Sequence, residues 1–386
     1  KYDTGCRIPR SEKRLTPYQL SKLEKVLGDF GLKIFKGFVL EKDITPFPEM
    51  FNDIKSILIV VRHQLGDMLC SVPMMRSVRK KFPGALITLV TKRSTGFKEI
   101  FENNNPPVDD IIMYEYGFEN FINTIKNIRD KKPELAIIPS SVIFSATNHL
   151  FGYYSQAMYR VGVRSKDYEP NKIGYTLNIK KDFLWDSKKV HQIERNLDVI
   201  RQIGITPEEN RLLLTINSEQ QKFADEFYEK NFPDKKRIVI GLHPGAAKEG
   251  NIWPYEKFAG LMDMLYNRTG AYFYVSEGPA DNKCVNELER ILNENFSYIE
   301  YAKYCGEIMK NAANISKTGL FISNDTGIMH LASGFDIPVI GLFGPTKAYE
   351  WGPVGTKKAS IQASGGKIKN IEITDVLETC MTYLSV

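Results

Sequence analysis

The chain has 386 residues, of which 42% are hydrophobic and 25% are charged, so a disordered or fibrous protein is excluded. The 52 lysines and arginines against 46 acidic residues give a net charge of +6. This mild basic excess suits an anionic ligand or surface and is weak evidence for nucleic acid, which we do not expect as a partner. Mean hydropathy is −0.28, and no apolar run approaches the ~20 residues that cross a bilayer.

Five cysteines are scattered along the chain without a Cys-x-x-Cys pair or zinc-like spacing. An odd, dispersed set is typical of reduced thiols. The first residues also lack the apolar core of a signal peptide. We therefore expect a cytoplasmic protein with no bound metal.

Residues 1–54 are predicted to form an N-terminal extension that is partly helical. Apolar residues recur at helical spacing from Leu20 to Phe30, which predicts a short amphipathic helix. That helix could pack on the first domain, or it could contact an acceptor or a membrane surface. The pattern favours packing.

Residues 55–215 are predicted to form a first α/β domain. Short, β-branched apolar runs are typical of parallel strands buried on both faces. Such runs lie at 56–61, 85–90, 111–113 and 135–138. Helical patterns follow the first run to residue 81 and recur at 192–203, and this alternation indicates right-handed crossovers. The aromatic segment 140–190 is predicted to form long loops.

A second α/β domain is predicted over residues 216–386. Its buried-strand runs lie at 237–242, 271–275, 319–323 and 338–343, with a helix at 255–266. The last helix could pack back on the first domain. Neither opening strand is followed by Gly-x-Gly-x-x-Gly, which disfavours a dehydrogenase.

The first strand is followed by Arg62-His-Gln-Leu-Gly66-Asp67. Gly66 permits a tight turn. Asp67 lies where a helix should begin, so it could cap that helix. A carboxylate at this sheet edge could instead act as a general base toward an acceptor hydroxyl. Local sequence alone favours the cap.

Two loops of the second domain could bind an anion. In His243-Pro-Gly245-Ala-Ala-Lys248 the small residues let backbone N–H groups approach a phosphate, and the lysine adds charge. Asp325-Thr326-Gly327 opens an apolar helix whose N-terminus suits a pyrophosphate, and His330 lies one turn further. A surface lysine, a helix cap and a packed histidine are the structural alternatives.

Acidic residues after the strand at 271–275 could bind a ribose. Glu277 or Asp281 could accept hydrogen bonds from its diol, as acidic residues do in dinucleotide sites. A turn followed by a helix cap is the favoured alternative.

Together these segments resemble the ADP-heptose:lipopolysaccharide heptosyltransferases, glycosyltransferase family 9. The resemblance covers about residues 55–380 and is most specific at Asp325-Thr-Gly-x-x-His330 followed by Phe343-Gly-Pro-Thr346. The other matching segments are Val60–Leu69, Ser71–Arg79, His243–Ala247 and Trp253-Pro254.

The resemblance implies a GT-B fold, in which two Rossmann-like domains with parallel sheets face a central cleft. It implies inverting, metal-independent transfer of heptose from a nucleotide diphosphate sugar, expected to be ADP-heptose, without a cofactor. Carried over by position, Asp67 is similar to the catalytic base and Lys248 to the lysine at the donor phosphates. The donor-binding loop would comprise Asp325, Thr326, Gly327 and His330, the ribose residue would be Glu277 or Asp281, and Gly66, His243 and Gly245 would support the loops.

The acceptor implied by this resemblance is a lipid-linked or lipopolysaccharide saccharide, which places the enzyme at the inner face of the inner membrane. Two alternatives remain open. One is a GT-B transferase or epimerase that uses another nucleotide sugar. The other is a non-catalytic module that binds a nucleotide sugar.

Overall fold

The computed structural model describes residues 36, 37, 39, 42–62, 64–93, 96–101 and 106–384. The helix predicted at 20–30 lies outside the described residues. The chain divides into two compact units, 1–42 and 43–386, and the second unit contains both sheets of the protein. Among the described residues, we find no helix with the length and apolar character needed to cross a bilayer.

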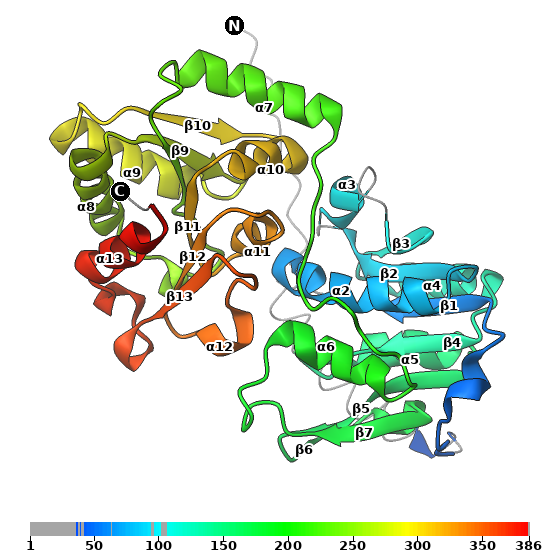
Figure 1. The fold of residues 1–386 in the computed structure, drawn as a ribbon. Helices are drawn as coiled ribbons and strands as arrows, with labels where there is room; N and C mark the ends of the chain where they lie inside the picture. The colour runs from blue at the N-terminus through cyan, green and yellow to red at the C-terminus, as the bar shows by residue number, and fades with distance from the viewer. Residues whose placement is uncertain are drawn as a thin grey trace, which may run out of the picture. The chain divides into compact units, whose positions relative to one another are not determined.

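The N-terminal domain is built on a sheet with strand order β3-β2-β1-β4-β5-β6, in which β7 also pairs with β5. Its pairings are parallel except that of β5 with β6, and Figure 1 shows the sheet with its helices. The strands are β1 (Ser56–Val60), β2 (Leu86–Lys92), β3 (Asp110–Tyr114), β4 (Leu135–Ile138), β5 (Tyr159–Lys166), β6 (Glu169–Pro170) and β7 (Ile179–Phe183). The α-helices are α2 (Leu65–Lys81), α3 (Phe97–Phe101), α4 (Phe118–Asp130), α5 (Ala146–Tyr154) and α6 (Gln192–Arg201).

The C-terminal domain contains a fully parallel sheet in the order β10-β9-β8-β11-β12-β13. The strands are β8 (Val239–His243), β9 (Tyr272–Glu277), β10 (Tyr301–Cys305), β11 (Leu320–Asn324), β12 (Val339–Phe343) and β13 (Lys358–Gln362). The α-helices are α7 (Ser218–Asn231), α8 (Tyr255–Thr269), α9 (Asn282–Asn295), α10 (Ile308–Ser316), α11 (Gly327–Ser333), α12 (Ala348–Trp351) and α13 (Ile373–Leu384). Numbered within the domain, this is the 3-2-1-4-5-6 order of doubly wound folds. The predicted fold of two Rossmann-like domains is confirmed.

Both faces of each sheet are covered, which explains the continuous apolar runs of the central strands. Ile57 and Ile59 of β1 join a core with α2 and α6, whereas Leu58 and Val60 join a core with α4 and α5. The first of these cores also takes in Leu331 of the C-terminal domain. The two domains therefore share buried apolar surface.

Several elements differ from the sequence predictions. The segment 140–190 contains α5, β5 and β7 instead of long loops. Charged side chains such as Arg160 and Lys181 interrupt the apolar pattern there, because these strands lie toward one edge of the sheet. The final helix, α13, packs with α8 and contributes Val376 and Leu377 to the core of its own domain, and not to that of the first.

In each sheet the strand order reverses beside the first strand, between β1 and β4 and between β8 and β11. Loops at the carboxyl ends of such strands diverge and leave room for ligands. In the first domain, the loops after β1 and β4 begin at residues 61 and 139. In the second domain, the loops after β8 and β11 begin at residues 244 and 325. They contain most of the predicted site residues.

Candidate active site

Asp67 is the third residue of α2, where its carboxylate accepts a hydrogen bond from the backbone N–H of Gln64 at 3.2 Å. Gln64, rather than Asp67, occupies the N-cap position, and the two residues form a reciprocal capping box. Asp67 thus helps to begin the helix, as the structural alternative required. Capping does not account for the raised pKa of its carboxyl group.

Burial raises the pKa of Asp67 from 3.8 to about 6, against the opposing effect of the Gln64 hydrogen bond. The carboxylate of Asp325 contributes to this rise in pKa, whereas the ammonium of Lys248 limits it. Both belong to the C-terminal domain, so Asp67 senses charges from the opposite sheet. A carboxylate with a pKa close to neutrality is suited to accept a proton in a reaction.

Asp325 follows β11 and lies in a group of polar side chains. Asn251 donates from Nδ2 to Asp325 Oδ2 at 3.2 Å and to Thr346 Oγ1 at 3.3 Å. Burial raises the pKa of Asp325, while the hydrogen bond with Thr346 and the charge of Lys248 lower it. The structure therefore brings the loops after β8, β11 and β12 together, and adds Asn251 and Thr346 to the predicted residues.

Lys248 lies at the end of the loop after β8, and its side chain is exposed. Its charge acts on both Asp67 and Asp325. An exposed lysine beside two carboxylates can turn to an incoming anion without a desolvation cost for its own charge. Its assignment to the donor phosphates remains a prediction.

Asn324 explains why the segment before Asp325 has a fixed shape. Its Nδ2 donates to the carbonyl oxygens of Pro244 at 2.9 Å and Gly245 at 3.3 Å, and its Oδ1 accepts from the backbone N–H of Trp253 at 3.2 Å. One buried amide thus joins the β8 loop to the β11 loop. Asn324, which directly precedes Asp325-Thr-Gly327, therefore fixes the position of one loop relative to the other.

Two of the predicted glycines, Gly66 and Gly327, lie where the two domains contact each other. A Cβ on Gly66 would lie 2.8 Å from Cδ2 of His330, and one on Gly327 would lie 2.9 Å from Cβ of Leu65. The first turns of α2 and α11 therefore lie so close together that only glycine, which has no Cβ, fits at these two positions without a shift of the neighbouring atoms. Thr326 is the N-cap of α11, with its hydroxyl accepting from the N–H of Met329 at 3.4 Å.

His330 is buried, with Nδ1 at 3.7 Å from the Sγ of Cys70 on α2. Burial, together with the nearby His191, lowers its pKa to about 3. The ring is therefore neutral and forms part of the contact between α11 and α2. This is the packed arrangement that the sequence left as an alternative, and contact of His330 with a donor remains a prediction.

The predicted ribose residues differ in their contacts. Asp281 accepts from the N–H of Gly278 at 2.8 Å and lies 3.8 Å from Nε2 of His243. A Cβ on Gly245 would lie 2.2 Å from Asp281 Oδ1, so this loop is closed tightly around the carboxylate. Glu277 ends β9 and accepts from Asn282 at 3.3 Å. The carboxylate of Asp281 thus holds together the loops that follow β8 and β9. The assignment of either residue to the donor ribose remains a prediction.

His243 supports the same loop. Its Nδ1 lies 3.0 Å from the backbone oxygen of Ser276, and burial lowers its pKa against the charge of Asp281. With Gly245, it holds the β8 loop against β9. The loop-support roles of His243 and Gly245 in a donor site remain predictions.

A family model for glycosyltransferase family 9 (heptosyltransferase) matches residues 150–381. The chain belongs to this family. Lipooligosaccharide heptosyltransferase 2 of Haemophilus influenzae is 23% identical over 339 residues, which cover 83% of this chain and 92% of that relative. The protein is therefore a glycosyltransferase of the heptosyltransferase family.

Solved structures of heptosyltransferase-family proteins share the fold. The glycosyltransferase family 9 protein of Veillonella parvula has a TM-score of 0.70 at 20% identity, covering 86% of this chain and 97% of that one. Escherichia coli heptosyltransferase WaaC, solved with ADP-2-deoxy-2-fluoro heptose, has a TM-score of 0.62 at 18% identity, covering 85% and 99%. The GT-B architecture implied by the sequence is confirmed at the level of fold.

Polar contacts also link the two domains of this protein beside the site. Arg195 of α6 forms ion pairs with Asp186 at 2.6 Å and with Glu350 of α12 at 2.9 Å. His191 Nε2 donates to the carbonyl of Gly352 at 2.9 Å, because its Nδ1 accepts from the N–H of Ile193. The sequence analysis missed Arg195 and His191, since their partners in the C-terminal domain lie more than 150 positions away along the chain.

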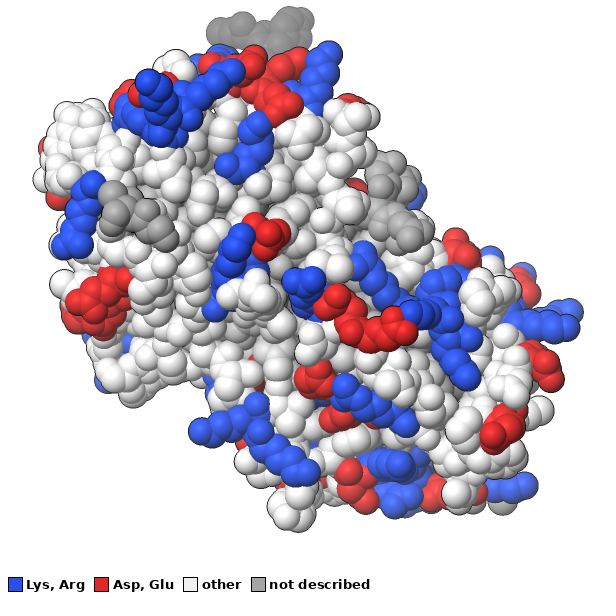
Figure 2. All heavy atoms as spheres, in the orientation of Figure 1, with Lys and Arg blue, Asp and Glu red and all other residues white. Residues whose placement is uncertain are grey.

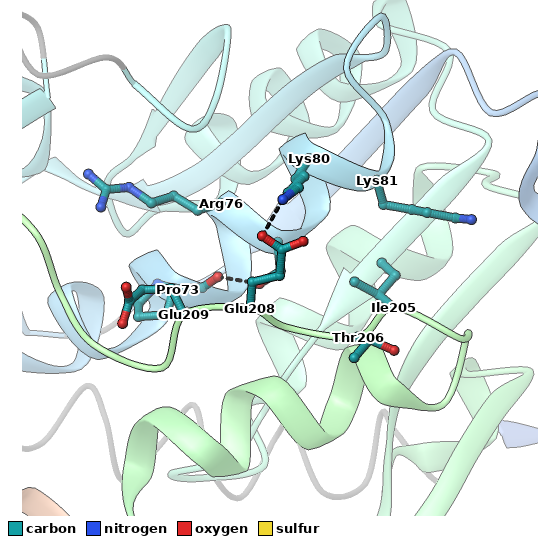
Figure 3. A pocket seen from close by; sticks show the side chains of 9 residues that line it. Pro73, Arg76, Lys80, Lys81, Ile205, Thr206, Glu208 and Glu209 are labelled. Atoms are coloured by element: carbon teal, nitrogen blue, oxygen red, sulfur yellow. Dashed lines mark hydrogen bonds and ion pairs between the residues drawn. The ribbon is translucent and has the colours of Figure 1, made fainter.

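Two other parts of the described surface also carry charged side chains (Figure 2 and Figure 3). Basic and acidic side chains are interspersed on the face shown in Figure 2. Figure 3 shows a groove between α2 and the segment after α6, where Lys80 pairs with Glu208. Arg76, which also lines this groove, donates to the backbone carbonyl of Leu213 at 2.8 Å. These cations are already partnered within the protein. Among the described residues, no group of three His, Cys, Asp or Glu side chains is arranged to hold a metal ion.

Proposed function

We propose that the protein transfers heptose from ADP-heptose to a saccharide of the lipopolysaccharide core. Family membership supports heptose transfer, and the relatives named above support this donor and acceptor class. The observation that carries the proposal is the half-buried carboxylate of Asp67, whose pKa is raised and responds to the charges of Asp325 and Lys248 in the opposite domain. It supplies a base at the point where a donor bound by the C-terminal domain would meet an acceptor.

The proposed reaction is a single displacement. The acceptor hydroxyl oxygen forms a bond to the anomeric carbon, while the bond from that carbon to the diphosphate oxygen breaks and its electron pair leaves with ADP. The carboxylate of Asp67 takes the hydroxyl proton. Because attack and departure occur on opposite faces of the sugar, the product has inverted anomeric configuration.

The C-terminal domain is proposed to stabilise the departing diphosphate without a divalent ion. The charge of Lys248 and the backbone N–H groups around Thr326 and Gly327 would offset the negative charge that develops. Asp325 would position this loop through Asn251, and Glu277 would accept from the donor ribose. The support is their shared position at the carboxyl edge of the second sheet.

Transfer assays with a panel of nucleotide sugars test this function. We expect turnover with ADP-heptose and a deacylated core saccharide, inversion at the anomeric carbon by NMR, and unchanged rates with EDTA. Turnover with a different sugar nucleotide, or rapid epimerisation of a donor without transfer, would refute the donor assignment. Loss of activity in EDTA that magnesium restores would refute metal independence.

We also propose that the enzyme works at the inner face of the inner membrane, where a lipid-linked acceptor is presented. The net charge of +6 supports attraction to an anionic surface. Co-sedimentation with vesicles that contain an anionic lipid is the test. Absence of binding at low salt would contradict this location.

A further inference from the structure

A small cavity lies at the reversal point of the first sheet, beside Asp67. Residues from the ends of β1 and β4 and from α2 and α6 line it, among them Ser71, Ser140, Gln192 and Asn196. Its volume is about 10 Å³, which is room for about one water molecule or one hydroxyl group.

A chain of hydrogen bonds fixes the orientation of the amide groups in this cavity. It begins at the backbone carbonyl of Cys70, which can only accept and which takes a hydrogen bond from Asn196 Nδ2 at 3.1 Å. The other end of that amide, Asn196 Oδ1, must therefore accept. It does so from the hydroxyl of Ser141 at 2.5 Å.

The next link orients Gln192. Because the proton of Ser141 is given to Asn196, the Ser141 oxygen has only lone pairs to offer, and Gln192 Nε2 donates to it at 2.5 Å. Gln192 Oε1 then points away from this chain. It is buried and has no hydrogen-bond partner among the described residues. The network thus makes Gln192 Oε1 an acceptor that lacks a donor.

Ser140 adds a second such group. Its side chain is 2% exposed, and its Oγ also has no hydrogen-bond partner among the described residues. Its backbone is left-handed, with φ at +47°, a conformation that is costly for a residue other than glycine. Two buried polar side chains that each lack a partner therefore line one cavity with Asp67.

We propose that this cavity binds a hydroxyl group of the acceptor saccharide other than the attacking one, with Gln192 Oε1 accepting a hydrogen bond from it and Ser140 Oγ forming the second hydrogen bond. This inference rests on the proposed function and assigns to Gln192 and Ser140 the selection of the acceptor hydroxyl presented to Asp67. A buried acceptor without a donor favours ligands that bring an O–H group. A ligand lacking that hydroxyl leaves both groups unsatisfied, which is how a polar site rejects a deoxy analogue.

The same helix offers a matched control. Gln202, at the end of α6, is also buried, donates from Nε2 to two backbone carbonyls, and has an Oε1 without a partner among the described residues. It is not among the residues that line the cavity. Gln202→Met therefore removes the same chemical groups as Gln192→Met at a position away from Asp67.

The experiment measures kcat/KM for a deacylated core oligosaccharide and for its monodeoxy analogues, with ADP-heptose as donor. For Gln192→Met we expect a fall of about tenfold in kcat/KM for the acceptor, with the donor KM and ADP affinity unchanged. Ser140→Gly, which suits the left-handed backbone, should act in the same direction. Gln202→Met should retain the wild-type acceptor kinetics.

With the wild type, kcat/KM for one monodeoxy analogue should be about tenfold lower than for the parent oligosaccharide. With Gln192→Met, that analogue and the parent should have equal kcat/KM, because the substitution and the deoxygenation remove the same hydrogen bond. Equal acceptor kinetics in Gln192→Met and Gln202→Met, or additive losses for every analogue, would overturn the inference and leave the cavity as a site for a structural water only. Failure of the proposed function is distinguishable, since the wild type would then show no transfer to any analogue.

Discussion

Asp67→Asn tests the electrostatics of the site, because it removes the charge and keeps an oxygen that can accept from Gln64. In the folded protein the pKa of Asp67 is about 6, against 3.8 for the unperturbed group. At 1.36 kcal/mol per pH unit, ionised Asp67 therefore destabilises the fold by about 3 kcal/mol. The folded state holds the proton more tightly, so this destabilisation develops as pH rises from 3.8 to about 6 and is constant above that range.

Above about pH 6, we expect Asp67→Asn to unfold at a higher urea concentration than the wild type. The corresponding gain in the free energy of unfolding is up to about 3 kcal/mol. The difference should vanish well below pH 3.8, where Asp67 is protonated in both the folded and the unfolded state. At the same time, kcat should fall by about 10²- to 10⁴-fold, as expected for loss of a general base. Asp67→Ala is the comparison, because it removes the charge and also the capping hydrogen bond.

Urea unfolding followed by circular dichroism at several pH values measures the first effect, and transfer kinetics measure the second. Equal stability of Asp67→Asn and the wild type above about pH 6 would show that the carboxylate is well solvated. Near-normal turnover would exclude Asp67 as the base. A gain in stability with a loss of activity is the combination that the structure requires.

Two further predictions concern the loop after β8. Lys248→Ala should weaken ADP binding in calorimetry and move the acidic limb of the pH–rate profile upward, because Lys248 lowers the pKa of Asp67; an unchanged profile would place the ammonium too far away to act. Gly245→Ala should lower the free energy of unfolding by about 1–3 kcal/mol, since its Cβ would lie 2.2 Å from Asp281 Oδ1. Gly84→Ala is the control, with no atom within 4 Å of its Cβ, and equal losses in the two variants would contradict the close packing of this loop.

The central strands could be predicted because burial on both faces leaves a continuous apolar run in the sequence. This holds for β1 and β4, and likewise for β8, β9, β11 and β12. Several strands toward the edges, such as β5, β7 and β13, carry no such signal. In β13, for example, Lys358, Ser360 and Gln362 alternate with partly exposed apolar residues, because one side of the strand has no neighbour.

The sequence by itself determined where chemistry-bearing loops follow buried strands, because Gly66-Asp67 and Asp325-Thr-Gly327 are local patterns that need only a strand before them and a helix after them. Only the tertiary structure decided what these residues contact. Asn196 reaches the carbonyl of Cys70 across 126 positions of sequence, and the pKa of Asp67 depends on burial and on charges from the second domain. Such contacts are set by the packing of distant segments, which leaves no periodic or local signal in the chain.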